Sequence, residues 1–335
     1  MGIKNFEVRL AEVGKIKIGG LGDKRKGQNG SDYRIPKKFD HFVVTTTERD
    51  KNGDLTVDQS IMKELGEKPK ELSIRLLFDD EDMNFFTSYQ YYAGKKCICR
   101  GDGENAQRKI TTNKEDVKKG KDPVFEIKPI KCDPKTCEFM KAGKCKVCGI
   151  LSCLLTKFPS FGGCYRFRTH SYGSVNNIMA ALKFFKANTN GVLQGLPLKL
   201  IFLKKATEDH GNVDTVGLVL DNIELANMRQ LAADEYVNRQ KLGVNIKAYE
   251  ATIKAIGFLE DKDPENEVAA EFYEEDPATP EKPKKGVTAD DLKGKLENKK
   301  VKPVEKTAEP TQQEVTSEPS TTDNDDETDN LNDNF

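Results

Sequence analysis

The sequence predicts an α+β protein with a strand-rich, OB-like or barrel-like core. Runs such as residues 5–18 (NFEVRLAEVGKIKI) alternate apolar and charged side chains, which is the period-two pattern of half-buried strands. Helical spacing of apolar residues is confined to a few segments. Residues 261–335 have too little apolar surface to offset the entropy of ordering them. We therefore expect an ordered body over residues 1–260 and a disordered acidic tail over residues 261–335.

The elements of the body follow from these patterns. Strands are expected at 5–18, 41–47, 72–78, 123–130, 150–158, 164–170, 198–203 and 216–220, with a short helix at 59–65. Ser174 is expected to begin a longer helix, because its hydroxyl can cap the first N–H groups and the apolar residues that follow share one face. Gly191 is expected to end it. Residues 224–257 carry helical periodicity with a break near Gly243.

The charge of the chain is distributed unevenly. The total is −1, but residues 261–335 contain 22 acidic and 10 basic residues and therefore carry −12. The 33 acidic and 44 basic residues that remain give residues 1–260 a charge of +11. A basic body with an acidic tail is typical of proteins that handle a polyanion.

Several classes of protein are disfavoured. No stretch approaches the roughly 18 consecutive apolar residues of a membrane span, so no membrane partner is expected. The first residues, MGIKNFEVRL, carry charges and no apolar run, which argues against a secretory signal and for a reducing, cytoplasmic compartment. The three histidines are scattered and no HExxH pattern lies near the cysteines, which disfavours a metal-dependent hydrolase and leaves no catalytic residue to assign.

All eight cysteines lie between Cys97 and Cys164. Four of them follow one another at spacings x4, x7 and x2: Cys132, Cys137, Cys145 and Cys148. Short cysteine pairs separated by turn residues are typical of a structural tetrahedral zinc site, and a strand end at Cys99 could supply a further ligand. A disulfide framework is the alternative, but a reducing compartment argues against it. We therefore expect a zinc lobe at about residues 97–164, while Cys153 and Cys164 are expected as buried thiols.

Two basic segments are candidate nucleic-acid surfaces. The Gly-rich stretch after residue 18 is either a mobile loop that follows a phosphate backbone or a solvated hairpin. Its cations are Lys24, Arg25, Lys26, Arg34, Lys37 and Lys38. In CYRFRTH, Arg166, Arg168 and His170 alternate with other residues, so one strand face would project all three beside the cysteines, and Tyr172 is assigned to the same surface. The alternative is a half-buried strand with a solvated basic face.

The segment NFFTSYQYY concentrates aromatic residues in a short run. Tyr89 and Tyr91 are the candidates for stacking on unpaired bases. At least half of the aromatics in this run must instead face a core.

Several segments within residues 1–225 carry a likeness to a known family. They are KKFDHFVVTT, the CRGDGE turn, Cys132-x4-Cys137-x7-Cys145, GILSCLL and GGCYRFRTHSYGSVNNI. Through them the chain resembles the recombination directionality factor-like proteins of phages that use serine integrases. The resemblance implies Cys99, Cys132, Cys137 and Cys145 as the zinc ligands and leaves Cys148 as an extra thiol, whereas the local spacing favours Cys148. Which of Cys99 and Cys148 completes the site stays open at this point.

The last residues of the tail carry a second likeness. An acidic end that finishes on an aromatic is similar to the C-terminal tip of bacterial and phage single-strand DNA-binding proteins. That resemblance implies recruitment of replication or recombination proteins through Asp333 and Phe335. A tail that served only solubility would show the acidic residues without needing the terminal phenylalanine.

These observations predict a non-catalytic, zinc-containing DNA-binding protein of phage-type replication or recombination, in the cytoplasm of a bacterial host cell. Single-stranded DNA is the expected substrate, with the acidic tail recruiting a partner. The alternative is a recombination directionality factor that acts by binding a serine integrase. A metal-dependent hydrolase is a further, disfavoured alternative.

Overall fold

The structure is a computed structural model, and it describes residues 10–26, 32–113, 115, 117, 123–158, 162–207, 211–255 and 265–273. The chain divides into two units, residues 1–279 and 280–335, and every described residue belongs to the first. None of the described helices combines the length and the apolar composition that a bilayer crossing requires.

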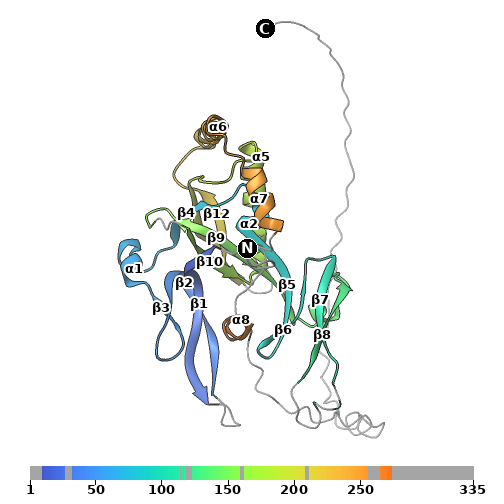
Figure 1. The fold of residues 1–335 in the computed structure, drawn as a ribbon. Coiled ribbons are helices and arrows are strands. Elements are labelled where there is room, and N and C mark those ends of the chain that lie inside the picture. The colour runs from blue at the N-terminus through green and yellow to red at the C-terminus, as the bar shows by residue number, and fades with distance from the viewer. Residues whose placement is uncertain are drawn as a thin grey trace, which may run out of the picture. The chain divides into compact units, whose positions relative to one another are not determined.

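The described strands form one 12-stranded sheet that branches at β9 (Figure 1). One path through it runs in the order β3-β2-β1-β10-β9-β5-β6-β7-β8, and a second leaves β9 through β4, β11 and β12. The strands are β1 (Ala11–Lys26), β2 (Asp32–Arg49), β3 (Leu55–Val57), β4 (Glu71–Leu76), β5 (Phe85–Ala93), β6 (Lys96–Gly101), β7 (Asn105–Thr111), β8 (Phe125–Lys131), β9 (Cys145–Leu155), β10 (Gly163–Thr169), β11 (Leu198–Thr207) and β12 (Gly211–Leu220). All pairings are antiparallel except that of β1 with β10.

The branch makes the sheet open, so the expected OB-like or barrel-like core is corrected. A barrel requires its first and last strands to pair. Here β9 pairs with β10 along one edge, while its other edge is shared between β5 and β4. The paths therefore end separately at β3, β8 and β12, each of which pairs with one strand among those described. The predicted α+β class and the strand-rich character are confirmed.

The helices lie mainly at one end of the sheet (Figure 1). They are α1 (Gln59–Leu65), α2 (Glu81–Asn84), α4 (Glu138–Lys141), α5 (Tyr172–Asn188), α6 (Leu225–Leu242), α7 (Ile246–Ala255) and α8 (Glu265–Phe272). Helix α5 packs on β9 and β12 and buries Ile178 and Leu182 against sheet residues such as Leu151 and Phe167. Because both faces contribute large apolar side chains, this contact forms part of the main hydrophobic core of the body.

The start of α5 differs from the sequence prediction. Ser171, not Ser174, caps the helix, and its Oγ accepts a hydrogen bond from the N–H of Ser174 at 3.3 Å. Ser174 lies within the helix, fully buried, and its Oγ accepts a hydrogen bond from the N–H of Val216 on β12 at 2.9 Å. The hydroxyl that a sequence pattern assigns to capping therefore joins the helix to the sheet.

The described parts of the basic Gly-rich stretch, residues 19–26 and 32–38, form paired strands of a β-hairpin. Residues 24–26 of β1 pair with residues 32–34 of β2, and Gly19 and Gly20 pair with Lys38 and Lys37. Of the two alternatives drawn from the sequence, the structure therefore matches the hairpin. The hairpin extends on the same side of the sheet as β7 and β8, with α8 between them (Figure 1).

The polar side chain of Asp79 joins helix α6 to the body. Asp79 accepts hydrogen bonds from the N–H groups of Leu193 and Gln194, both at 2.9 Å, and forms an ion pair with Arg239 of α6. Only 10% of the Arg239 side chain is exposed, so its charge requires acceptors, and Asp79 supplies one beside Glu235 and Gln194. Helix α7 is attached in a similar way, since Glu250 accepts hydrogen bonds from the N–H groups of residues 79 and 80.

Helix α8 and the following Tyr273 pack on the body, although the composition of residues 261–335 predicts a disordered tail. Helix α8 contacts β1, β2 and β6. Its Val268 and Ala269 are each 3% exposed and form a small apolar cluster with Tyr92 and Cys97. The rest of the expected tail, residues 261–264 and 274–335, lies outside the described residues.

The Asp79–Arg239 contact predicts a measurable loss of stability. Asp79→Ala leaves the N–H groups of residues 193 and 194 without their acceptor and removes one carboxylate from the Arg239 guanidinium, which keeps Glu235 and Gln194. We expect the free energy of unfolding to fall by about 2–3 kcal/mol, as for a lost hydrogen-bonded charge. Glu235→Ala is the matched control, because it removes an exposed i,i+4 partner of the same arginine and should cost about 0.5 kcal/mol or less. Urea unfolding of both variants measures the difference, and equal losses would contradict the role assigned to Asp79.

Candidate functional site

Strand pairing brings distant cysteines to one part of the sheet. Tyr91 of β5 lies between β9 and β6, and its register partners are Cys145 on one side and Cys99 on the other. Cys132 directly follows β8, and Cys137 is the residue before α4. Three strands and the β8–β9 connection thus converge on the region that the sequence predicts as a zinc lobe.

The backbone around Cys132 is closely packed. The N–H of Cys132 donates to the carbonyl oxygen of Glu104 at 2.7 Å, and the N–H of Gly103 donates to the Cys132 sulfur. A Cβ on Gly101 would lie 2.8 Å from the Cys132 Sγ and 2.8 Å from the carbonyl oxygen of Asn105. The CRGDG turn therefore supports the sulfur from two sides, and only glycine leaves room for it at position 101.

The electrostatics of four thiols are linked. Burial, followed by the charges of Cys137, Cys99, Cys132 and Cys97 in that order, raises the pKa of Cys145 to about 12. Burial also raises the pKa of Cys132, with Cys99 and Cys137 adding to the increase and the Gly103 N–H opposing it. Close thiolates repel one another, and a bound cation is the ordinary means of relieving that repulsion. No set of three or more His, Cys, Asp or Glu side chains within the described ranges has the arrangement of a metal site.

Cys148 lies apart from this group. It is on the same strand as Cys145 but an odd number of positions away, and successive side chains of a strand point to opposite faces. It is fully buried, and its sulfur accepts a hydrogen bond from the Arg168 Nη1 at 3.2 Å. Cys153 and Cys164 are also buried, in agreement with the sequence prediction.

An aromatic stack stands beside the cysteines. The Tyr91 ring packs on the Phe139 ring of α4, with centroids 4.3 Å apart. The Arg108 guanidinium lies over the Phe139 ring, 4.6 Å from its centroid. Tyr91 therefore has an aromatic neighbour within the protein, whereas it was predicted to stack on bases. Sequence reasoning missed Phe139, although it is the single aromatic between Cys137 and Cys145. The two other aromatic candidates differ in exposure. Tyr89 is partly buried, which raises its pKa, whereas Tyr172 is 71% exposed.

The predicted basic strand face is β10, and α8 covers it. Lys17, Arg166 and Arg168 line a small cavity together with Val268, Glu271 and Phe272 of α8. Arg168 is 9% exposed, and Arg166 forms an ion pair with Glu12. The His170 ring packs on Phe272 with centroids 4.5 Å apart, and its Nδ1 lies 2.7 Å from the carbonyl oxygen of Val147. No local pattern around β10 indicates this cover, since α8 follows about a hundred residues later.

The cations of the β1–β2 hairpin are more accessible. Lys26, Lys37 and Lys38 are exposed, whereas Arg34 forms an ion pair with Asp54 at 2.6 Å. The side chains of Lys24 and Arg25, and the tail residues Asp333 and Phe335, lie outside the described residues.

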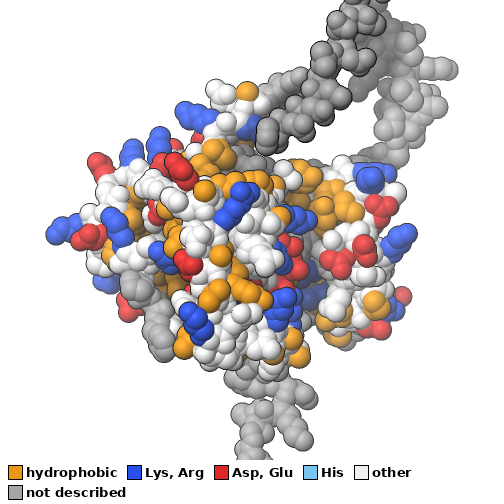
Figure 2. Space-filling view, turned by 90° about the horizontal axis from the view of Figure 1, so that it is seen from above, with side chains coloured by type: hydrophobic (Ala, Val, Ile, Leu, Met, Phe, Trp, Pro, Cys, Tyr) orange, Lys and Arg blue, Asp and Glu red, His pale blue; other side chains and the backbone are white. Residues whose placement is uncertain are grey.

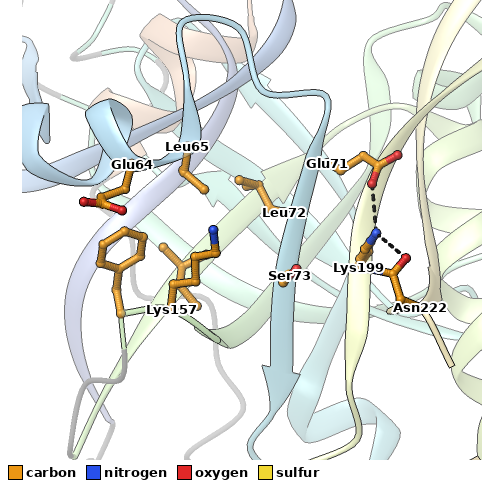
Figure 3. A pocket seen from close by; sticks show the side chains of 10 residues that line it. Glu64, Leu65, Glu71, Leu72, Ser73, Lys157, Lys199 and Asn222 are labelled. Carbon is orange, nitrogen blue, oxygen red and sulfur yellow. Dashed lines mark hydrogen bonds and ion pairs between the residues drawn. The ribbon is translucent and has the colours of Figure 1, made fainter.

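A separate cavity of about 330 Å³ opens between α1, β4 and β11 (Figure 3). Lys199 projects into it and donates hydrogen bonds to Glu71 at 3.0 Å and to Asn222 at 3.1 Å. The hydrogen bond to Glu71, followed by that to Asp221, raises the pKa of Lys199. The lysine is thus held in its charged form by these acceptors, which indicates a structural role.

The geometry at Gly101 predicts that alanine is not tolerated there. A Cβ would meet Ala106 and the Asn105 carbonyl as well as the Cys132 sulfur, all within 2.8 Å. We expect Gly101→Ala to lower the free energy of unfolding by about 1–3 kcal/mol, the usual cost of overpacking. Gln107→Ala, an exposed change on the neighbouring β7, is the control and should have little effect. A Gly101→Ala protein as stable as this control in urea unfolding would show that the turn can move away from Cys132.

Comparisons with known proteins identify a family. The family model described as Gp3-like, recombination directionality factor-like, matches residues 13–226, more than half of the chain. The match covers nearly all of β1, the whole branched sheet with α5, and the converging cysteines. Searches of the curated proteins and of the solved structures found no match. The sequence segments quoted for the resemblance lie within the matched range, and the chain belongs to the recombination directionality factor-like family.

Proposed function

We propose that this protein acts as a recombination directionality factor that binds a serine integrase and changes which recombination reaction the integrase favours. The observation that carries the proposal is the family match over residues 13–226. Such a factor acts through a protein partner and does not need a long DNA-binding surface. The covered state of Arg166, Arg168 and His170 agrees with that requirement better than with tight DNA binding through β10.

The exposed surface of α6 and α7 supports a protein partner. Large apolar side chains at this end of the molecule remain in solvent: Phe184, Leu231, Tyr236, Val237, Leu242, Val244 and Tyr249. Figure 2, which looks onto this end, shows apolar side chains among interspersed acidic and basic ones and no continuous basic patch. Exposed aromatic and aliphatic groups with mixed charges around them are typical of protein interfaces. We assign the integrase contact to this surface.

Binding of single-stranded DNA is a second candidate function. The charge of +11 over residues 1–260 and the exposed Lys26, Lys37 and Lys38 favour contact with a phosphate backbone. The β1–β2 hairpin that carries these lysines projects from the sheet, so it can contact single-stranded DNA without rearrangement of the protein core (Figure 1). In this function the acidic tail would compete with DNA and recruit a partner through Phe335.

We further propose that Cys99, Cys132, Cys137 and Cys145 hold one structural zinc ion. The support is chemical: the four thiols lie on converging elements, the pKa values of Cys145 and Cys132 are raised by burial and by the neighbouring thiols, and the turn at Gly101 and Gly103 is shaped around one of the sulfurs. Four thiolates match the preferred ligands of structural zinc, which would fix the β6 turn to the β8–β9 connection. Cys148 is not included, because it faces Arg168 from the other side of β9.

The zinc proposal predicts about one zinc per chain in protein purified without chelator, as expected for a single four-thiolate site. Cys99→Ser should lose the metal, since it removes a ligand. Cys148→Ser should keep it, since that thiol lies elsewhere. Elemental analysis of both variants beside the parent makes the measurement. If Cys99→Ser keeps its zinc and Cys148→Ser loses it, Cys148 and not Cys99 is the fourth ligand. Parent protein without zinc would refute the site.

The integrase proposal is tested by reconstituted recombination. Adding the protein to its serine integrase should suppress integrative recombination and stimulate excisive recombination. Leu231→Asp combined with Leu242→Asp should abolish both effects, because these exposed side chains are eleven residues apart, about three helical turns, and share one face of α6. Asn238→Asp adds charge on that face without removing an apolar group and should leave both effects unchanged.

The same preparation distinguishes the two candidate functions. Salt-dependent binding to a short single strand, together with no change in either recombination reaction, would reject the directionality factor in favour of the second candidate. Recombination effects that survive the double leucine change would instead reject the assignment of the contact to α6.

A further inference from the structure

We propose that α8 occupies a docking groove on the body and that the vacated groove binds an acidic amphipathic helix of a partner protein. This goes beyond the proposed function, since it concerns the opposite end of the sheet from α6 and requires no integrase. The groove, called the α8 groove here, is formed by Lys17, Tyr92, Cys97, Lys109, Lys146 and His170.

The groove recognises the first turn of α8 through a carboxylate. Glu265 accepts a hydrogen bond from the backbone N–H of Cys97 at 3.1 Å, and it forms an ion pair with Lys109 at 2.5 Å. Because two donors from different strands meet one side chain, the contact sets the position of the helix along the groove. A neutral side chain at this place would leave the lysine without its charged partner.

The far end of α8 is recognised by a second set of contacts. Lys146 donates to the carbonyl oxygen of Phe272 at 3.1 Å and lies 4.7 Å from the centre of the Tyr273 ring. A cation at a helix C-terminus is favourable, because the last carbonyl groups carry partial negative charge. On the side of the helix, Glu271 pairs with Lys17 at 2.9 Å.

The floor of the groove is apolar. Val268 and Ala269 of α8 pack on Tyr92 and Cys97, and the Tyr273 ring lies 4.5 Å from that of Tyr92. A phosphate backbone would satisfy the lysines but would leave this floor uncovered. An acidic helix with one apolar face satisfies both, which is why we assign the groove to a peptide and not to DNA.

Three features make α8 a replaceable occupant. Its apolar cluster is separate from the main core, so the core is complete without it. The family match ends at residue 226, before α8 begins. Finally, a helix of eight residues is too short to be stable alone, so α8 gains its helical form by docking and loses it on release.

The test uses a fluorescent synthetic peptide of residues 263–276 (DPENEVAAEFYEED) as the probe. The full chain with Glu265→Lys, Glu271→Lys and Phe272→Ala should release α8 and open the groove. The peptide should then bind at least about tenfold tighter than to the parent, in which the tethered α8 competes at a millimolar effective concentration. Glu64→Lys with Glu67→Lys, two exposed acids outside the groove, gives a similar change of charge and should behave like the parent.

A second readout does not depend on the probe. Cys97 is 5% exposed beneath α8, so its alkylation, followed by mass analysis, reports release of the helix. Lys109→Glu should accelerate alkylation, and Lys109→Glu combined with Glu265→Lys should restore part of the slow rate, because it reverses the ion pair but loses the acceptor for the Cys97 N–H. Equal alkylation in all of these proteins would overturn the proposal.

DNA is the main competing occupant, and the same variants decide between the two. The triple variant that releases α8 should gain much less affinity for a 30-nucleotide DNA strand than for the peptide. Gain of DNA binding without peptide binding would assign the groove to a polyanion and overturn the proposal. Peptide binding that is equal in the parent and the released variant, or absent from both, would overturn it as well.

Discussion

The fold depends on the hydrogen-bonding requirement of one strand. Every buried N–H and C=O group of β9 needs a hydrogen-bond partner. Three neighbouring strands supply these partners. The first part of one edge pairs with β5 and the last part with β4, while β10 pairs along the other edge. Three groups of strands are therefore joined at β9, and the convergence of the cysteines is a result of the same pairing.

The sequence predicts the local features of the site better than their surroundings. Cysteine spacing locates the lobe, and strand alternation correctly places Arg166 and Arg168 on a common side of β10. Spacing alone treats Cys145 and Cys148 as a turn-like pair, because it does not indicate that a strand begins at Cys145. In the structure both cysteines lie on β9 three positions apart, so the alternation of side chains along the strand places their sulfurs on opposite faces. The open sheet was not predictable for a related reason: the pairings that distinguish a branched sheet from a barrel are long-range.

Side chains far along the chain decide which surfaces remain exposed. The predicted basic face of β10 meets α8, whose residues the composition of the tail assigns to disorder. Composition averages over a long segment, and eight residues with a suitable apolar face are lost in that average. The C-terminal helices share one mode of attachment, since α6 relies on Arg239 and α8 on Lys17 and Lys109. The ion pairs of α8 are partly exposed, so the attachment of α8 is more sensitive to salt than the apolar contact between α5 and the sheet.

The parallel pairing of β1 with β10 has a consequence for biosynthesis. Residues 11–16 align with residues 163–167, so β1 leaves the ribosome about 150 residues before its partner. At ordinary rates of translation this interval lasts roughly 8–30 s, which is long compared with hairpin formation. During that time β2 is the available neighbour of β1, and the apolar side of their hairpin stays uncovered. The nascent chain therefore passes through a stage in which its own core does not yet cover this surface.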